Sequence, residues 1–414
     1  MSGDTQTLLD GRVALHRGDC IDVMAAMPEN SVDAIITDPP YHLTSIVKRF
    51  GSDGASEAKE GQTGAFKRAS AGFMGKQWDG GDIAFRTETW VAALRVLKPG
   101  GYILAFASTR GFARMSVAIE DAGFVVHPLI AWIFGSGFPK ATRVKAKGYE
   151  GHRYGGQALK PAIEPIFMGQ KPFEKGLSGT ENILKWGTGA LWIDGCRVGT
   201  DGGTEAINFV KKPDGRNERW DEQYVGARNE IAQIGKGRWP ANVIHDGSDE
   251  VVAAFPETGI SSGGKGAASQ RTALGGDVYG SYSHASLGAN AGGLGDSGSA
   301  ARFFYSSKAD KSDRAGSKHP TVKPIDLMRY LVRLVTPTNG IVLDPFAGTG
   351  TTGEAAWREG MNAVLIEREP EYQSDIVERM RLCLAGPEEK RRAITKRRGL
   401  VDDNAGPLFG GGAA

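Results

Sequence analysis

The chain is 414 residues long, and 40% of its residues are hydrophobic and 24% charged. This length can bury a large core and predicts a globular protein of two or three domains. No window approaches the ~18 consecutive apolar residues of a membrane-spanning helix. The N-terminus has neither the basic start nor the apolar core of a secretory signal, so we expect a cytoplasmic protein without a membrane partner.

The cysteines, histidines and charged residues of the sequence limit the kinds of site that we expect. The cysteines are three, far apart, at Cys20, Cys196 and Cys383, which fits a reducing compartment and no disulfide framework. The seven histidines are scattered without an HExxH motif, and we therefore expect no metal site. The net charge of +2 neither requires nor excludes a nucleic-acid partner, because a basic groove can coexist with an acidic remainder.

Strands and helices alternate early in the chain and again near its end. The hydrophobic patterns predict, in chain order, a strand at 32–36, a helix at 88–97, a strand at 102–108, a helix at 116–124 and a strand at 125–134. The alternation returns as a helix at 324–336, a strand at 340–346, a helix at 351–360 and a strand at 362–367. This rhythm predicts an α/β fold with a doubly wound, mostly parallel sheet.

Irregular segments separate these two regions and suggest domain boundaries. We expect two halves of one domain, at 11–172 and 301–384, with an irregular region at 173–300 between them. A stretch rich in Gly, Ser and Lys at 44–82 predicts a mobile loop, and 258–301 is either a linker or a segment that orders on a polymeric partner. The end of the chain, at 385–414, predicts a basic, flexible tail that is solvated or adds phosphate contacts.

A glycine-rich turn marks a candidate nucleotide site. Gly348, Gly350 and Gly353 satisfy GxGxxG between a strand and a helix, and Glu367 ends the next strand. Glycines let the backbone approach a ligand, and a carboxylate on the second strand can accept hydrogen bonds from two ribose hydroxyls. A tight turn that needs glycines for its geometry is the alternative.

The residues around this turn favour S-adenosylmethionine over a dinucleotide. Asp344 at the strand tip can accept from an ammonium group, and the segment HPTVKP at 319–324 offers donors for a carboxylate. The methionine part of S-adenosylmethionine carries both an ammonium and a carboxylate group, whereas a dinucleotide would bring a second phosphate instead.

The turn DPPY at 38–41 is the second candidate site. An exocyclic amine such as adenine N6 is a poor nucleophile, because its lone pair is delocalised into the ring. The Asp38 carboxylate and the Pro39 carbonyl can accept from its two N–H bonds and draw the nitrogen toward sp³ geometry. The Tyr41 ring can stack on the base, which must leave the duplex to reach this site. An ordinary strand-ending turn is the alternative.

Together, DPPY, HPTVKP and DPFAGTGTT at 344–352 resemble the motifs of the S-adenosylmethionine-dependent DNA amino-methyltransferases. The catalytic motif precedes the cofactor loop, with an irregular region between them, which is similar to the permuted beta group of that family. The resemblance implies a circularly permuted, Rossmann-like class I methyltransferase fold with an inserted target-recognition domain. It covers roughly residues 15–41, 96–173 and 300–372.

The resemblance also implies roles for individual residues. Those that would hold the target base are Asp38, Pro39, Pro40 and Tyr41. Those that would bind the cofactor are Asp19, His319, Thr321, Lys323, Asp344, Phe346, Gly348, Gly350 and Glu367. Asp19 would accept from the cofactor adenine, although it can equally cap the helix that follows. Glu164 would contact the residues that bind the ligands and not the ligands themselves.

The implied activity is methylation of adenine N6 in double-stranded DNA, since a leading Asp in this turn is usual for adenine enzymes of the family. Methylation of cytosine N4 is the first alternative. A nucleotide-dependent dehydrogenase, a catalytically dead DNA-binding homologue and a protein or RNA methyltransferase are the others. We therefore expect a nucleoid-associated protein that requires no metal. A homodimer and a cognate restriction enzyme are compatible with this activity.

Overall fold

The computed structural model describes residues 5–41, 82–199, 237–259, 296–307, 311–317 and 322–399. The chain divides into two compact units. The first consists of Met1–Trp192, Asn242–Ser248 and Ser307–Ala414, and the second of Ile193–Ala241 and Asp249–Ser306. The loop expected at 44–82 lies outside the described residues except for Asp82, as does most of the segment at 258–301.

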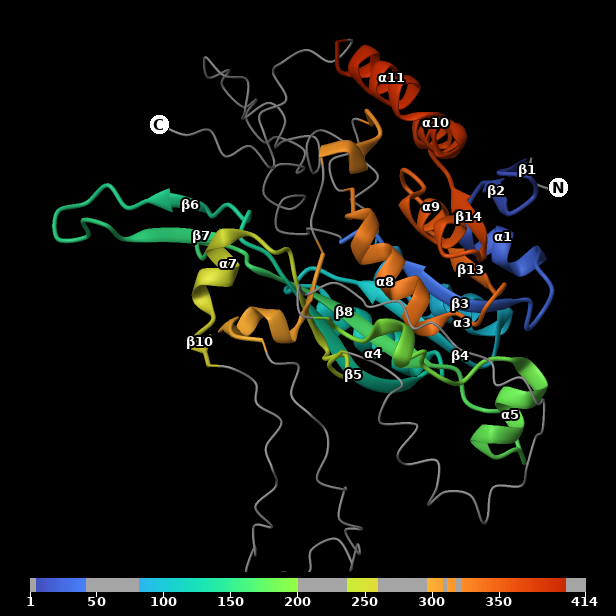
Figure 1. Ribbon diagram of the computed structural model, residues 1–414. Helices are drawn as coiled ribbons and strands as arrows, with labels where there is room; N and C mark the ends of the chain where they lie inside the picture. The colour runs from blue at the N-terminus through green and yellow to red at the C-terminus, as the bar shows by residue number, and fades with distance from the viewer. Residues whose placement is uncertain are drawn as a thin grey trace, which may run out of the picture. The chain divides into compact units, whose positions relative to one another are not determined.

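The first unit is built on a large twisted sheet (Figure 1). Its strands lie side by side in the order β1 (Thr5–Leu8), β2 (Val13–Arg17), β14 (Asn362–Glu367), β13 (Ile341–Asp344), β3 (Val32–Thr37), β4 (Leu97–Phe106), β8 (Ile163–Gln170), β5 (Val125–Ile133) and β9 (Val243–His245). The run from β2 to β4 is parallel throughout. Strand β8 is antiparallel to both of its neighbours, and β1 is antiparallel to β2. The mostly parallel α/β sheet predicted from the sequence is confirmed.

The two halves of the sequence meet in the middle of this sheet. Strand β13, from the C-terminal half, pairs with β3, from the N-terminal half, with Val342 opposite Ala34 and Leu343 opposite Ile35. Every residue of β3 is buried, as parallel strands covered on both faces require. The strands at 13–37 and at 341–367 therefore form one continuous sheet although some three hundred residues separate them in the chain.

Helices cover both faces of the sheet. The helices α1 (Cys20–Ala26), α3 (Thr87–Val96) and α4 (Phe112–Asp121) share one apolar cluster with Ile35 and Ile103. The residues next to these two in β3 and β4 point to the other face and are also buried. That face packs against α8 (Ile325–Val335) and α9 (Thr351–Arg358), followed in the chain by α10 (Pro370–Leu384).

The first unit extends to Trp192, beyond the boundary at 173 that the sequence predicts. The reason lies in helix α5 (Gly179–Trp186), whose buried Asn182 donates to the carbonyl of Pro99 at 2.9 Å. A capping box of Ser178 and Glu181 starts this helix. The remaining elements of the unit are β6 (Lys140–Arg143), β7 (Arg153–Gln157), the 3₁₀ turns η2 (Ile83–Phe85) and η5 (Lys311–Arg314), and α11 (Pro387–Gly399).

Helix α11 replaces part of the flexible tail expected at 385–414. The segment starts with Pro387, carries Glu388 and Glu389 in its first turn, and continues with cations, a charge order that suits the helix dipole. Its described side chains are mostly exposed. Among the described residues, no helix combines the length and the apolar character needed to cross a membrane.

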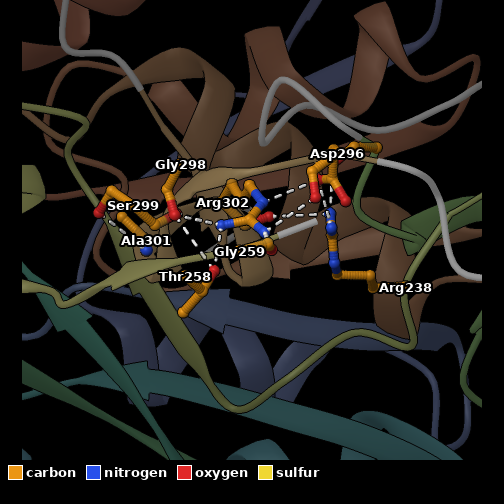
Figure 2. A network of polar contacts seen from close by, with 9 residues as sticks. Arg238, Thr258, Gly259, Asp296, Gly298, Ser299, Ala301 and Arg302 are labelled. Carbon is orange, nitrogen blue, oxygen red and sulfur yellow. Dashed lines mark hydrogen bonds and ion pairs between the residues drawn. The ribbon is translucent and has the colours of Figure 1, made fainter. Parts of the chain in front are cut away.

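The second unit is organised by one arginine. Its elements are η3 (Asp194–Cys196), α7 (Asp249–Ala254), β10 (Glu257–Thr258), β11 (Gly298–Ser299), η4 (Ala300–Phe303) and β12 (Tyr305–Ser306). Arg302 pairs with Asp296 at 2.9 Å and donates to the Thr258 hydroxyl at 2.6 Å and the Ser299 carbonyl at 3.0 Å (Figure 2). The guanidinium thus joins Thr258 to Asp296 and Ser299, which come from either side of the undescribed segment 260–295.

Replacing Arg302 should destabilise the second unit. The variant Arg302→Met removes the donors while keeping the length of the side chain, so that Asp296 and the Ser299 carbonyl lose their hydrogen bonds from Arg302. We expect the free energy of unfolding to fall by about 3 kcal/mol, the scale of a broken buried ion pair. Urea denaturation measures it, with Arg143→Met, at an exposed position, as the control. Equal stability of the two variants would contradict this organising role.

Candidate functional site

The site lies in the first unit, where β3 and β13 end side by side. Thr37, the last residue of β3, donates its hydroxyl hydrogen to the Asp344 carboxylate at the tip of β13, over 2.7 Å. Both residues are buried. This hydrogen bond holds the DPPY turn beside the DPFAGTG turn, and both turns line one cavity of about 680 Å³.

The glycine turn has the conformation that its sequence predicts. Gly348 has φ +53° and Gly350 has φ +78°, both in the left-handed region that side chains disfavour. A Cβ on Gly353 would lie 2.8 Å from Leu365 Cδ1, so this glycine lets α9 approach β14 closely. Gly348 and Gly350 are therefore needed for their backbone conformation, and Gly353 is needed for close packing.

Asp344 fixes the start of the glycine turn. Its Oδ1 accepts from Thr37 and from the backbone N–H of Phe346 at 3.1 Å, and its Oδ2 accepts from the Thr352 hydroxyl at 2.6 Å. Burial raises the pKa of Asp344 to about 6, against the opposing effect of these donors. Phe346 lies beside it on the cavity wall.

Glu367 lies at the end of β14, where a ribose-binding acid is predicted. Its Oε2 accepts from the backbone N–H of Gly348 and its Oε1 from that of Glu369, both at 2.8 Å. The carboxyl group lines the cavity, and burial raises its pKa to about 7. The Glu367 carboxylate thereby joins the end of β14 to the glycine turn.

Four polar side chains meet at the DPPY end of the cavity. The Tyr41 hydroxyl lies 2.7 Å from Asp38 Oδ1 and also contacts Glu164 Oε1. Lys323 Nζ lies 3.0 Å from Asp38 Oδ2, 2.8 Å from Glu164 Oε1 and 3.2 Å from the Tyr41 hydroxyl. The ammonium group also sits over the ring of Phe106, 4.6 Å from its centroid. Two carboxylates and one ammonium thus surround one phenol.

Burial and the mutual charges set the protonation of this group, which we call the Tyr41 cluster (Asp38, Tyr41, Glu164 and Lys323). Burial raises the pKa of Glu164 above its ordinary value, although Lys323 opposes this. Burial also raises the pKa of Tyr41, and the two carboxylates add to the rise. Burial alone would lower the pKa of Lys323, but Asp38 and Glu164 reverse that effect and raise it. The lysine therefore stays charged.

The other predicted site residues are distributed as follows. Pro39 and Pro40 line the cavity with Asp38. Asp19 also lines it, and at the same time caps α1 by accepting from the N–H of Ile21 at 2.9 Å, so both readings of this residue are compatible with the structure. His319 and Thr321 lie outside the described residues.

Lys323 lines the cavity at its DPPY end. It is predicted among the cofactor-binding residues, but its ammonium group pairs with Asp38 and Glu164 of the Tyr41 cluster. The position directly before α8 explains this, because α8 packs against β3 and β4 and carries the lysine to their ends.

Arg379, which the sequence motifs do not mark, supports the glycine turn from behind. This arginine of α10 is only 2% exposed and donates to the Thr349 carbonyl, to Glu354 Oε2 and to the Asp313 carbonyl, each at 2.7 Å. No motif surrounds it, and its partners lie 25 to 66 positions away in the chain. Within the described residues, no group of three or more His, Cys, Asp or Glu side chains could hold a metal ion.

Known proteins are similar in sequence to parts of this chain. The relatives include the Type II methyltransferase M.HindIII of Haemophilus influenzae, 26% identical over 200 residues, which are 42% of this chain and 63% of the relative. M.HinfI, also from Haemophilus influenzae, is 40% identical over 78 residues, 19% of this chain and 22% of the relative. The chain thus spans less than two thirds of the length of these relatives.

Among solved structures, the cytosine-N4-specific PvuII DNA methyltransferase aligns over 96% of this chain and 97% of its own, at 12% identity and a TM-score of 0.42. The complex of M1.HpyAVI with S-adenosylmethionine aligns over 89% and 98%, at 17% identity and a TM-score of 0.39. The family model described as DNA methylase, which covers the N6 and N4 enzymes, matches residues 32–378, most of the chain and both of the turns that form the site. The chain belongs to this DNA methylase family.

Proposed function

We propose that the protein transfers a methyl group from S-adenosylmethionine to the N6 amino group of an adenine flipped out of double-stranded DNA. The observation that carries this proposal is the shared cavity. A turn suited to a nucleoside cofactor and a turn suited to an exocyclic amine lie side by side at adjacent strand ends, joined by the hydrogen bond from Thr37 to Asp344. Methyl transfer needs the two reactants in near contact, and a cavity shared by the two turns supports such an arrangement.

The cofactor would lie along the glycine turn. Glu367 would accept from the ribose hydroxyls, and the left-handed turn at Gly348 and Gly350 would let the backbone approach the ligand. Asp19 is suited to the adenine and Asp344 to the ammonium of the methionine end. The segment 319–323, with His319 and Thr321, would bind the carboxylate. When bound, S-adenosylmethionine supplies an electrophilic methyl group on a sulfonium.

The target base would enter beside the DPPY turn. The Asp38 carboxylate and the Pro39 carbonyl would accept from the two N–H bonds of the amino group and free its lone pair for attack. Pro39 and Pro40 stiffen the backbone that sets the spacing of these acceptors. The ring of Tyr41 would stack on the base.

A basic hairpin next to the cavity supports DNA as the substrate. The residues between β5 and β8 include β6 and β7, which extend away from the sheet (Figure 1). Residues 135–162 carry six cations, Lys140, Arg143, Lys145, Lys147, Arg153 and Lys160, against the single acid Glu150. Phe134 and Pro161, at the two ends of this segment, line the cavity. Such a hairpin suits the phosphate backbone of a bound duplex.

The second unit, which overlaps the region expected at 173–300, is our candidate for target recognition. Trp239 is 64% exposed, and the guanidinium of Arg197 lies over its ring, 5.3 Å from the centroid. Cations and exposed rings together suit a nucleic-acid surface. A cognate restriction enzyme would complete a modification system, as the Type II methyltransferases among the relatives suggest. A homodimer also fits the proposal.

The first test is methyl transfer itself. Purified protein should methylate unmethylated duplex DNA, and mass spectrometry of the nucleosides should find N6-methyladenine; N4-methylcytosine would favour the second candidate function. The variant Asp38→Ala should lose at least about 100-fold in rate, because it removes an acceptor of the reacting amine. Calorimetric binding of S-adenosylhomocysteine should persist in the variant. Normal transfer by Asp38→Ala would refute the role given to Asp38.

Cofactor affinity should depend on pH through Glu367. Its pKa of about 7 in the free protein means that a proton must leave before the carboxylate accepts from two hydroxyls. Affinity should therefore fall by about tenfold as the pH is lowered from about 8 to about 6. Calorimetry with S-adenosylhomocysteine measures this, and Glu367→Gln should bind weakly with a flatter profile. A pH-independent affinity of the wild type would contradict the assignment.

Charge inversion on the hairpin should weaken DNA binding without affecting the chemistry. Replacing Lys145 and Lys147 by Glu should lower the affinity at about 0.1 M salt by tenfold or more, and reduce the slope of log affinity against log salt by about two. The rate at saturating DNA should stay unchanged. The matched control inverts Lys175 and Lys185, whose loss should not alter the slope. Equal salt slopes for the two double variants would remove the hairpin from the DNA interface.

A further inference from the structure

The Tyr41 hydroxyl faces two carboxylate oxygens but carries only one hydrogen. The Tyr41 oxygen contacts a carboxylate oxygen of Asp38 and one of Glu164, both at hydrogen-bonding distance or closer. A phenol has one hydrogen and can donate it to one acceptor only. The second contact becomes a hydrogen bond only when one of the two carboxyl groups takes up a proton. The three groups therefore form a line along which protons can be shared, from Asp38 through Tyr41 to Glu164.

Glu164 is suited to the far end of this line. It lies on β8, opposite Trp132 of β5, and its side chain is 13% exposed. The charged and titratable groups that face it are Lys323, Asp38 and Tyr41. Lys323 lies 2.8 Å from Glu164 Oε1, so its charge stabilises the ionised form that can accept a proton. The same lysine contacts Asp38 and the phenol, and holds all three in place.

Methylation of an amine produces a proton that must leave. The nitrogen–carbon bond forms as the sulfur–carbon bond breaks, and the electron pair of the broken bond stays on sulfur. The amine nitrogen then carries a positive charge, the new methyl group and both of its hydrogens. One hydrogen must depart as a proton to give a neutral product. Asp38, next to the amine, is the first acceptor, but it needs an outlet to be ready for the next turnover.

We propose that Glu164 is the terminal proton acceptor of the reaction, reached from Asp38 through the hydroxyl of Tyr41. This inference rests on the proposed function. Asp38 and Glu164 both start ionised: the amine proton passes to Asp38 Oδ1 and from there to the Tyr41 oxygen, while the original Tyr41 hydrogen passes to Glu164 Oε1. Asp38 and Tyr41 end as they began, and Glu164 ends as a neutral acid. It releases its proton to solvent once the products leave.

The relay predicts a characteristic dependence of rate on pH. Only ionised Glu164 can accept, so the single-turnover rate at saturating cofactor and DNA should rise with pH as this group ionises. The raised pKa of Glu164 places that rise above the ordinary range of a glutamic acid. The variant Glu164→Gln keeps the shape of the side chain but accepts no proton. It should lose about 100-fold in rate and also lose the rise with pH.

Companion variants separate a relay from a merely structural contact. Tyr41→Phe keeps the ring but removes the bridging hydroxyl, and should show the same loss and the same flat profile. The double variant should be no slower than either single one, because the two residues act as a unit. Glu120→Gln, on the exposed side of α4, is the matched control and should behave as wild type. If Glu164→Gln does not fold, Tyr41→Phe carries the test alone.

The outcomes distinguish the two proposals. A slower Glu164→Gln variant that retains the wild-type rise with pH would overturn the relay and leave Glu164 a structural role. A wild-type rate in Glu164→Gln or in Tyr41→Phe would overturn it as well. Absence of transfer to adenine or cytosine by the wild-type protein would instead refute the proposed function on which the relay rests.

Discussion

The whole site depends on the parallel pairing of β3 with β13 and on the hydrogen bond from Thr37 to Asp344 that closes it. These two residues are 307 positions apart in the chain. The pairing brings two turns of different chemistry to one edge of the sheet, where the carboxyl ends of parallel strands meet and ligands bind in α/β folds. Helices on both faces bury the strands and fix the register, because a slip would move buried side chains out of place.

Burial of carboxyl groups is the second constraint. Asp344, Glu367 and Glu164 all have pKa values raised by burial, at a cost to the folded state that their donors partly offset. Asp344 accepts hydrogen bonds from two hydroxyl groups and one backbone N–H. Glu367 accepts from backbone N–H groups, and Glu164 accepts from the ammonium group of a lysine. Acids held in this state are suited to binding hydroxyls or taking up protons, and Arg379 secures the loop between them.

Much of the fold followed from local patterns. The strand at 32–36 and the helix at 324–336 are predicted because their apolar residues keep the spacing of a buried strand and of one helical face. The glycine turn is predicted because its three glycines keep the GxGxxG spacing between a strand and a helix. The place of Lys323 was not predictable, since its partners Asp38 and Glu164 lie far away in the sequence. Arg379 was missed for the same reason. The helical end at 387–399 was overlooked because its charges suggested solvent more than helix.

The most direct measurement is a crystal structure of the protein with S-adenosylhomocysteine bound. We expect the ribose at Glu367 and the sulfur within about 6 Å of the Asp38 carboxylate, close enough for an amine held there to reach a methyl on sulfur. A ligand bound elsewhere, or a sulfur more than about 10 Å from Asp38, would contradict the claim that the two turns form one active site.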